Sequence, residues 1–355
     1  MSICVDIEKT VGSFTLKVCF SAGDETLALL GASGCGKSMT LRCIAGIERP
    51  DRGRIVVDGV TLFDSRQHIN LTPQERHVGL MLQSYGLFPN MTVLQNIRTG
   101  ARREKDKVKR EAAVQRVMDS FGLAPLAQRY PHQLSGGQQQ RAALARILVS
   151  APRILLLDEP FSALDSHLRF RLEQEVRQVI RDFGKTVLLV SHDRDEVYRM
   201  ADSIAVMNAG RIEAIGDKRQ VFAAPVTRSG AVLTGCKNIS AAEVRGNGCV
   251  YAADWGVELA MEDVPEDMAY VGIRMHDILP DGGENAIRCR VAEVIENPFS
   301  VTVMLRPVGA ESAVSIGWET EKETWRERQA EEVTVSLPMK ALLPLRRSEE
   351  EGAIR

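Results

Sequence analysis

The most constraining feature of the sequence is the octapeptide GASGCGKS, which spans residues 31–38. It starts at the last residue of the apolar run TLALLG and leads into the helical pattern KSMTLRCIAGI. A glycine-rich turn between a buried strand and a helix fits the phosphate-loop pattern GxxxxGK[ST] in full. In such a loop backbone N–H groups surround a β-phosphate, Lys37 reaches the β- and γ-oxygens, and the Ser38 hydroxyl coordinates Mg²⁺. We therefore expect a parallel α/β nucleotide-binding fold.

Three further polar positions follow apolar strands. Asp158 and Glu159 end the run ILLLDE, His192 ends VLLVSHD, and Gln83 follows GLML. Carboxyl ends of parallel strands share one edge of a sheet, so these side chains are expected near the phosphate loop. Asp158 is the expected magnesium carboxylate and Glu159 the general base for an attacking water. His192 is expected to contact the γ-phosphate, and Gln83 to sense both metal and water.

The charge and the cysteines of the chain narrow the possible partners and compartment. The 355 residues include 45 basic and 47 acidic residues, a net charge of -2, which disfavours nucleic acid as a partner. Apolar runs stay below the roughly 20 residues that cross a bilayer, and the start MSICVDIEK differs from a secretory signal. The seven cysteines form no CxxC pair. We expect a cytoplasmic chain with reduced thiols.

Sequence patterns predict two domains. An ATPase-type α/β domain is expected over residues 1–225, opening with an antiparallel hairpin and holding a helical insertion at about 86–150. Residues 226–235, within APVTRSG and beyond, suggest a linker. Alternating segments such as VTVMLRPV then predict a small all-β domain over 236–355, which contains all three tryptophans, with a frayed tail at about 346–355.

These motifs together resemble the ATP-binding subunits of ABC importers. GASGCGKS is similar to the Walker A motif, Gln83 to the Q-loop, and ILLLDE to Walker B. LSGGQ at 134–138 resembles the signature motif, SALD at 162–165 the D-loop, and His192 the switch histidine. All six occur in the family's order within residues 1 to about 225.

The resemblance implies a site for ATP and Mg²⁺ shared between two chains. Catalysis is assigned to Glu159, His192 and Lys37, and the metal to Ser38, Gln83 and Asp158. The D-loop residue is Asp165. The residues implied to bind ATP are Gly31, Ala32, Ser33, Gly34, Cys35, Gly36, Lys37, Ser38, Met39 and Gln83. The residues implied to cap the γ-phosphate of a partner chain are Leu134, Ser135, Gly136, Gly137 and Gln138.

Phe14 and Cys35 lie close to the expected site without a settled role. Phe14 is the best placed residue to stack on adenine, but its alternation with Leu16 and Val18 equally permits a core role. Cys35 lies inside the phosphate loop, and we hypothesise that a thiol reagent would block ATPase activity and that bound ATP would protect it.

The resemblance also implies the partners. It implies a homodimer of ATPase subunits, two permease subunits, an indirect role for an extracytoplasmic solute-binding protein, and a location at the cytoplasmic face of the membrane. The stretch Tyr85, Leu87, Phe88 and Pro89 is the expected permease groove, although these side chains also suit packing of the insertion.

The C-terminal part resembles the OB-like, TOBE/MOP-type regulatory domain of such importers. The hairpin TVGSFTLKVCF, TGCKNIS at 234–240 and VGIRMHDI are most similar to molybdate or tungstate importers. Sulfate, iron(III), polyamine and sugar importers remain alternatives. Residues 234–240, with Lys237, suit either a tetrahedral dianion or an ordinary linker. A soluble ABC ATPase acting on nucleic acid or ribosomes is a second class, but a duplicated ATPase unit and a long coiled coil are both missing from this sequence.

Overall fold

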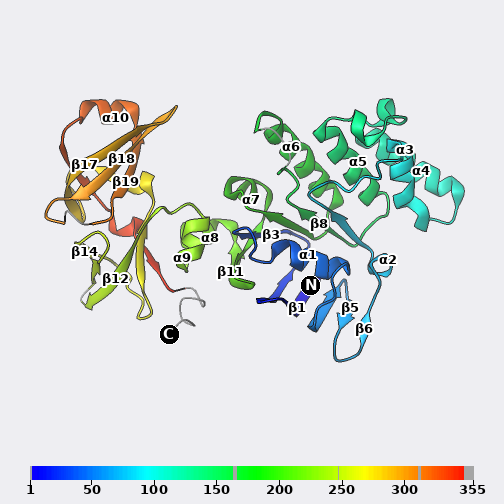
Figure 1. The fold of residues 1–355 in the computed structure, drawn as a ribbon, viewed down its shortest axis with the longest axis horizontal. Helices are drawn as coiled ribbons and strands as arrows, with labels where there is room; N and C mark the ends of the chain where they lie inside the picture. The colour runs from blue at the N-terminus through cyan, green and yellow to red at the C-terminus, as the bar shows by residue number, and fades with distance from the viewer. Residues whose placement is uncertain (1, 163–165, 247, 311–312, 348–355) are drawn as a thin grey trace. The chain divides into compact units, whose positions relative to one another are not determined.

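The computed structural model describes residues 2–162, 166–246, 248–310 and 313–347. The chain divides into two compact units, Met1–Lys218 and Arg219–Arg355. Figure 1 traces both units along the chain. Each unit is described by itself below.

The first unit is built on a mixed six-stranded sheet in the order β11-β10-β3-β9-β8-β7. The five strands from β10 to β7 run parallel, and β11 pairs with β10 in the antiparallel sense. Strands β3, β8 and β9 are buried along their whole length, as their continuous apolar sequences predict. The bounds are β3 (Thr26–Gly31), β7 (Val78–Met81), β8 (Ile154–Asp158), β9 (Val187–Ser191), β10 (Ser203–Asn208) and β11 (Arg211–Asp217).

A second, antiparallel sheet in this unit has the order β2-β1-β4-β5-β6. The expected entry hairpin is confirmed, since β1 pairs with β2 along its length. Alternate side chains of both strands, from Ile3 to Ile7 and from Leu16 to Phe20, are buried in the core. The bounds are β1 (Ile3–Val11), β2 (Phe14–Ala22), β4 (Arg52–Val57), β5 (Val60–Asp64) and β6 (Ile69–Asn70).

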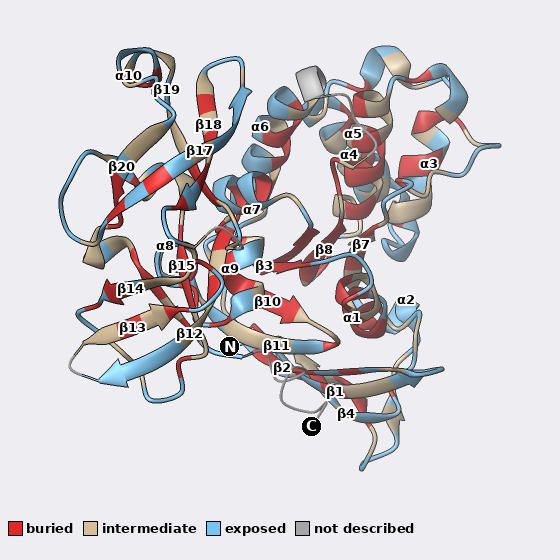
Figure 2. Cartoon of the chain, turned by 60° about the vertical axis from the view of Figure 1, so that its left-hand side comes forward, coloured by how far each residue is buried: buried red, intermediate tan, exposed pale blue. Residues whose placement is uncertain are grey.

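Helices flank the mixed sheet, and three of them form the helical insertion. Figure 1 draws α3, α4 and α5 together, away from β1, β5 and β6. Figure 2 shows much of α5, β3 and β8 as buried. The bounds are α1 (Lys37–Ala45), α2 (Pro73–Arg76), α3 (Val93–Gly100), α4 (Lys107–Ser120), α5 (Gly136–Leu148), α6 (Ser166–Phe183) and α7 (Arg194–Met200), with short 3₁₀ turns η1 (Ala101–Arg103), η2 (Ala124–Leu126) and η3 (Pro131–Gln133).

The second unit is dominated by two antiparallel five-stranded sheets, β14-β13-β12-β15-β21 and β16-β20-β17-β18-β19. The three tryptophans, Trp255, Trp318 and Trp325, are buried in its core. The all-β prediction is confirmed apart from short helices. The strands are β12 (Asn238–Gly246), β13 (Cys249–Ala252), β14 (Val257–Ala260), β15 (Tyr270–Ile273), β16 (Leu279–Pro280), β17 (Ala286–Glu296), β18 (Ser300–Pro307), β19 (Ile316–Glu321), β20 (Glu332–Ser336) and β21 (Leu343–Leu345).

The expected linker at residues 226–235 is instead folded. It contains α9 (Arg228–Leu233), which Thr227 caps by accepting a hydrogen bond from the Gly230 N–H. Arg346, expected in a frayed tail, forms a β-bridge with Thr227, and its guanidinium lies 2.9 Å from Asp267. The linker prediction was wrong because an N-cap and a distant strand partner order this segment. The other short helices are α8 (Lys218–Ala223), α10 (Lys322–Glu327), η4 (Met275–Asp277) and η5 (Met339–Ala341).

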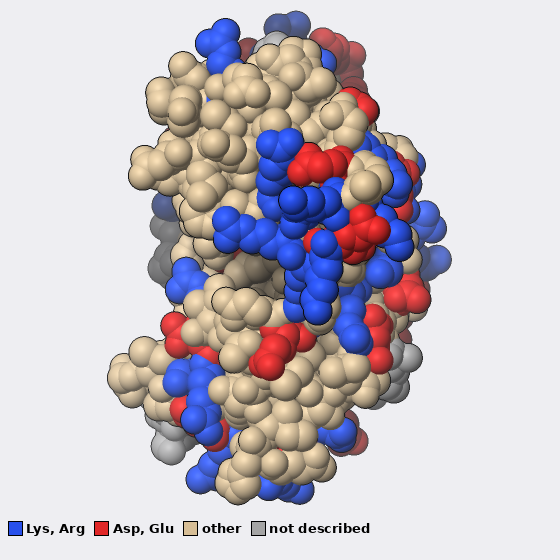
Figure 3. Space-filling model, turned by 90° about the vertical axis from the view of Figure 1, so that its right-hand side faces the viewer, with Lys and Arg blue, Asp and Glu red and all other residues tan. Residues whose placement is uncertain are grey.

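The surface near the helical insertion carries charges of both signs. Residues 101–110 contain six basic and two acidic residues, and those from 102 to 109 are exposed. Figure 3, which faces the side that Figure 1 draws at the right, shows Lys and Arg interleaved with Asp and Glu. Within the described residues, none of the helices is both long and apolar enough to span a bilayer.

Candidate nucleotide-binding site

The phosphate loop connects β3 to α1 and leaves no room for larger side chains at its last glycine. Gly36 has a φ of 106°, and a Cβ added there would lie 2.7 Å from a methyl carbon of Leu16. The side chain of Lys37 is buried, and its Nζ donates hydrogen bonds to the carbonyl oxygens of Gly31 at 2.7 Å and Ala32 at 2.9 Å. A glycine-lined backbone loop with a buried ammonium group fits a bound phosphate.

The remaining loop residues divide between the surface and the core. Ala32, Ser33 and Gly34 are exposed, whereas Met39 packs against the main core. Cys35 is only 5% exposed, and its Sγ lies 3.8 Å from the Nζ of Lys37. The thiol therefore faces the protein, so the hypothesis that a reagent readily reaches Cys35 is weakened by its burial.

Two of the three residues expected to hold Mg²⁺, Ser38 and Asp158, come from different motifs and meet directly. The Ser38 hydroxyl, at the start of α1, donates a 2.7 Å hydrogen bond to Oδ1 of Asp158, at the end of β8. Burial raises the pKa of the Asp158 carboxyl, while the Ser38 hydrogen bond and the nearby Arg42 oppose the rise. A partly desolvated carboxylate beside a hydroxyl is the oxygen-rich environment that Mg²⁺ prefers.

Glu159 and His192 also converge at this edge of the sheet. Oε1 of Glu159 lies 3.2 Å from Nδ1 of His192. Glu159 has a φ of 46°, in the left-handed region that costs a non-glycine residue energy. Its N–H donates to the carbonyl of Val190 in β9, which holds this strained backbone in place. The Glu159 side chain is 19% exposed and that of His192 is 56% exposed, so both can meet a ligand.

The loop after β7 contains the predicted sensor and the predicted permease groove. Gln83 is exposed. Tyr85 is buried, with a φ of 59°, and burial raises the pKa of its phenol. Phe88 is 47% exposed, and the Arg146 guanidinium carbon lies 5.1 Å from the centre of its ring. Of the aromatic pair expected to form the groove, Phe88 therefore faces solvent, while Tyr85 belongs to the core of the unit.

The LSGGQ segment forms the start of α5. Oγ of Ser135 accepts a hydrogen bond from the Gln138 N–H, and Oε1 of Gln138 accepts one from the Ser135 N–H, which together form a capping box. Ser135 is exposed, whereas Gly137 is buried against Leu172 of α6. Ser135 at the start of the helix is therefore accessible from the surface, as an anion-binding site at a helix N-terminus requires. Asp165, from the expected D-loop, lies outside the described residues.

Phe14 lies beside the phosphate loop. A Cβ added to Gly36 would come within 3.2 Å of Cζ of the Phe14 ring. The ring is partly buried and packs against the main core. Its position beside the loop suits both adenine stacking and a core role.

The stretch at residues 234–240 uses its polar side chains within its own unit. The Thr234 hydroxyl donates to the carbonyl of Gly230. The Asn238 amide donates to the carbonyl of Gly317 and accepts from its N–H, at 2.7 and 2.8 Å. Lys237 is exposed. The structure therefore does not bring these residues together as a dianion site, and supports a structural role for them.

A buried carboxyl behind His192 was missed by sequence reasoning. Glu196 of α7 is 4% exposed and, with Arg169, lines a cavity of about 50 Å³ that also borders Glu159 and His192. The pKa of Glu196 is raised to about 8, mainly by burial and also by the carboxylates of Asp193 and Glu173, while the Ser191 hydroxyl and Arg169 oppose the rise. The spacing from His192 was visible in SHDRDE, but the burial of the side chain was not.

Known proteins are similar to this chain over both units. Residues 15–162 match the family model described as ABC transporter. A sulfate/thiosulfate import ATP-binding protein of Chromobacterium violaceum is 40% identical over 80% of this chain and 77% of its own length. A trehalose/maltose import ATP-binding protein of Thermococcus litoralis is 35% identical over 95% of each chain. A dimeric post-hydrolysis structure of an ATP-binding cassette with ADP and Pi has a TM-score of 0.52 and 26% identity, over 61% of this chain and 99% of that one.

Proposed function

This chain belongs to the ATP-binding subunits of ABC import systems, and we propose that it hydrolyses ATP to drive uptake of an oxyanion, molybdate or tungstate, through separate membrane permease subunits. The observation that carries the ATPase assignment is the 2.7 Å hydrogen bond between Ser38 and Asp158. It joins the phosphate loop to the strand that ends in Asp158 and Glu159. This contact supports one nucleotide site formed by two separate motifs.

The proposed ATP site uses the loop residues for binding. Backbone N–H groups of residues 31–38 would surround the β-phosphate, and the Lys37 ammonium would neutralise the β- and γ-oxygens. Ser38, Asp158 and Gln83 would hold Mg²⁺, which supplies charge neutralisation to the phosphates. The 2.7 Å contact between Ser38 and Asp158 supports this metal set, since a cation would replace the shared proton.

The proposed chemistry rests on Glu159 and His192. Glu159 would accept the proton of the attacking water, and His192 would contact the γ-phosphate and orient the attack. Their 3.2 Å separation supports a coupled role, because the imidazole fixes the carboxylate and the carboxylate fixes the ring. The left-handed backbone of Glu159 supports a positioned rather than a purely structural side chain.

We propose that two chains act together. The exposed Ser135 and the N-terminal N–H groups of α5 would bind the γ-phosphate held by Lys37 of a second chain. Asp165 would lie in the D-loop at the same interface. The similar cassette described as dimeric, with ADP and Pi, supports this assembly.

We propose that exposed Phe88 and Pro89 receive the permease at the cytoplasmic face of the membrane. A solute-binding protein would act on the permease from the other side. Aromatic and Arg side chains are enriched in protein interfaces, and the Arg146 guanidinium carbon lies 5.1 Å from the centre of the Phe88 ring. Arg146 ties this loop to α5, since its Nη1 donates to the carbonyl of Gly86 at 2.8 Å.

The oxyanion proposal is supported by the relative named for sulfate and thiosulfate, which are oxyanions like molybdate. The relative named for trehalose and maltose keeps a sugar as a second candidate solute. Iron(III) and polyamines complete the set of candidate solutes. Residues 234–240 do not help to choose among these solutes, because the Thr234 and Asn238 side chains form hydrogen bonds within their own unit.

Uptake by cells lacking this gene tests the solute. We expect loss of radiolabelled molybdate or tungstate uptake, restored by the wild-type gene but not by Glu159→Gln. Loss restricted to sulfate, iron(III), spermidine or maltose would replace the proposed solute with that one. Co-purification of the chain with ribosomes in place of a membrane protein would contradict the importer assignment and favour the soluble class.

A further inference from the structure

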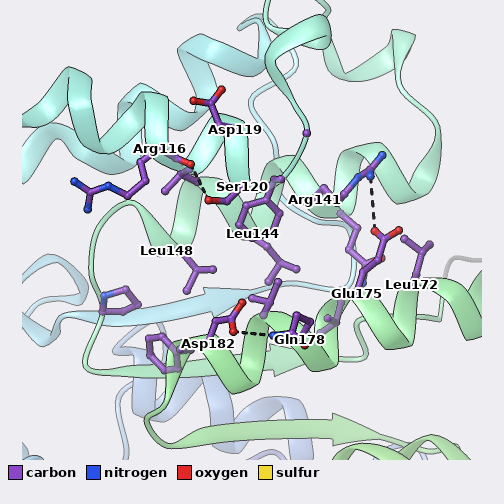
Figure 4. A pocket seen from close by; sticks show the side chains of 18 of the residues that line it. Arg116, Asp119, Ser120, Arg141, Leu144, Leu148, Leu172, Glu175, Gln178 and Asp182 are labelled. Atoms are coloured by element: carbon purple, nitrogen blue, oxygen red, sulfur yellow. Dashed lines mark hydrogen bonds and ion pairs between the residues drawn. The ribbon is translucent and has the colours of Figure 1, made fainter.

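A cavity of about 770 Å³ lies in the first unit, between the helical insertion and α6. Leu144 and Leu148 of α5 face it from one side, and Leu172, Val176 and Val179 of α6 from the other. Figure 4 shows the two leucines in its middle, with Arg141 and Glu175 at one end. The residues that line it do not include the phosphate loop, Glu159 or His192. The cavity is therefore distinct from the nucleotide site.

Three side chains that line this cavity have a buried polar atom without a hydrogen-bond partner in the described part of the chain. Gln140 is completely buried, and its Nε2 donates to the carbonyl of Pro160 at 3.2 Å, but its Oε1 has no hydrogen-bond partner among the described residues. The same holds for Nε of Arg141 and Oε2 of Glu175. These two side chains still form an ion pair, with Nη1 of Arg141 3.8 Å from Oε2 of Glu175, although this distance is too long for a hydrogen bond. Buried polar atoms are normally hydrogen-bonded, so Oε1 of Gln140 in particular needs a donor.

The chemistry of the lining selects the class of ligand. The volume of the cavity, about 770 Å³, falls within the range of roughly 300–1,000 Å³ that small-molecule sites occupy. The charged lining residues are balanced, with three of each sign, which favours a neutral ligand. They are Arg116, Arg141, Lys185, Asp119, Glu175 and Asp182. The apolar walls favour a ligand that is mostly apolar, and Oε1 of Gln140 favours a ligand with an N–H or O–H group that can donate a hydrogen bond to it.

We propose that this cavity binds a neutral, apolar small molecule carrying an N–H or O–H group that donates to Oε1 of Gln140, and that the bound molecule slows ATP turnover. The effect on turnover rests on the proposed function. The expected effect on turnover follows from the position of Gln140. This residue lies on α5, five residues after Ser135, and its side chain donates a hydrogen bond to the carbonyl of Pro160, the residue after Glu159. A ligand there would fix the signature helix relative to the strand end that carries the catalytic base.

Binding is tested directly with N-phenyl-1-naphthylamine, a neutral fluorescent aromatic amine with one N–H donor. We expect saturable binding to the full-length chain. Val179→Trp, which fills the cavity from a partly exposed position, should weaken it about tenfold or more. Gln174→Trp, on the exposed face of the same helix, is the matched control and should leave it within about twofold.

Two further measurements separate the parts of the proposal. The N-methylated probe lacks the donor and should bind about tenfold more weakly to the wild-type chain. Absence of saturable binding, or equal binding to Val179→Trp and wild type with matching circular dichroism, would overturn the site. Equal affinity of both probes would overturn the role of Gln140.

The effect on turnover is measured with saturating probe. We expect the kcat for ATP to fall about fivefold or more while KM stays within about twofold. Competition with ATP would contradict a separate site, and an unchanged kcat with bound probe would refute the coupling. A chain that binds the probe but hydrolyses no ATP under any condition would instead count against the proposed function.

Discussion

Replacing Glu196 by Gln should stabilise the first unit at alkaline pH. The carboxyl is 4% exposed, its Oε1 has no hydrogen-bond partner among the described residues, and the carboxylates of Asp193 and Glu173 face it. Burial, the largest cause, raises its pKa from 4.5 to about 8, against the opposing effects of Ser191 and Arg169. A neutral amide of the same shape avoids the cost of a buried charge.

The sign and size follow from proton linkage. Between pH 4.5 and about 8 the folded state keeps a proton on Glu196 that the unfolded state has lost, so the free energy of unfolding falls as pH rises. The loss is complete above about pH 8, and at about 1.4 kcal/mol per pH unit it amounts to at most about 5 kcal/mol. The adjacent 50 Å³ cavity can admit water, which reduces the penalty. We expect Glu196→Gln to gain about 2–5 kcal/mol at pH 9 and little at pH 5.

Urea unfolding at pH 5, 7 and 9 measures this gain. Far-UV circular dichroism follows the helices, most of which are in the first unit, while tryptophan fluorescence follows the second unit, where Trp255, Trp318 and Trp325 lie. Glu104→Gln, at an exposed position, is the control. Parallel pH profiles of Glu196→Gln and wild type, or a gain confined to the fluorescence transition, would refute the reasoning.

Three further predictions concern the signature serine, a buried arginine and the cysteines. Ser135→Arg should keep nucleotide binding, measured by calorimetry, and abolish ATP turnover; equal loss of both would argue against the shared site. Arg76→Met should lower the free energy of unfolding by about 3 kcal/mol, because the buried guanidinium donates to the carbonyls of Cys43 and Ile44 at 2.7 and 2.9 Å; an unchanged urea midpoint would contradict this. Brief maleimide labelling, read by mass spectrometry, should modify exposed Cys4 before buried Cys35; the opposite order would show that the loop opens readily.

The nucleotide fold could be predicted because its signals are local. GASGCGKS sits between β3 and α1, and the apolar runs before Asp158 and His192 form the buried parallel strands β8 and β9. In these segments the spacing of glycine, lysine and apolar residues determines the backbone, so the sequence alone was sufficient.

The remaining features depend on contacts between distant segments. Residues 226–235 resemble a linker in sequence because they contain Thr, Ser and Gly. In the structure, however, Thr227 forms a β-bridge with Arg346, which lies more than a hundred positions further along the chain. The orientations of Cys35 and Tyr85 likewise depend on what packs behind each loop. The positions of Gln140 and Glu196 in the sequence also do not reveal that Oε1 of each side chain lacks a hydrogen-bond partner among the described residues.

The capping box at the start of α5 has a consequence for the kinetics of assembly. Oγ of Ser135 accepts from the Gln138 N–H, so the hydroxyl proton can still be donated to a phosphate without breaking the cap. The second chain of the proposed dimer would then bind a helix start that is already ordered, with no folding of this segment needed on association. We expect the association rate of two ATP-loaded chains to follow solvent viscosity and ionic strength, as for encounters limited by diffusion.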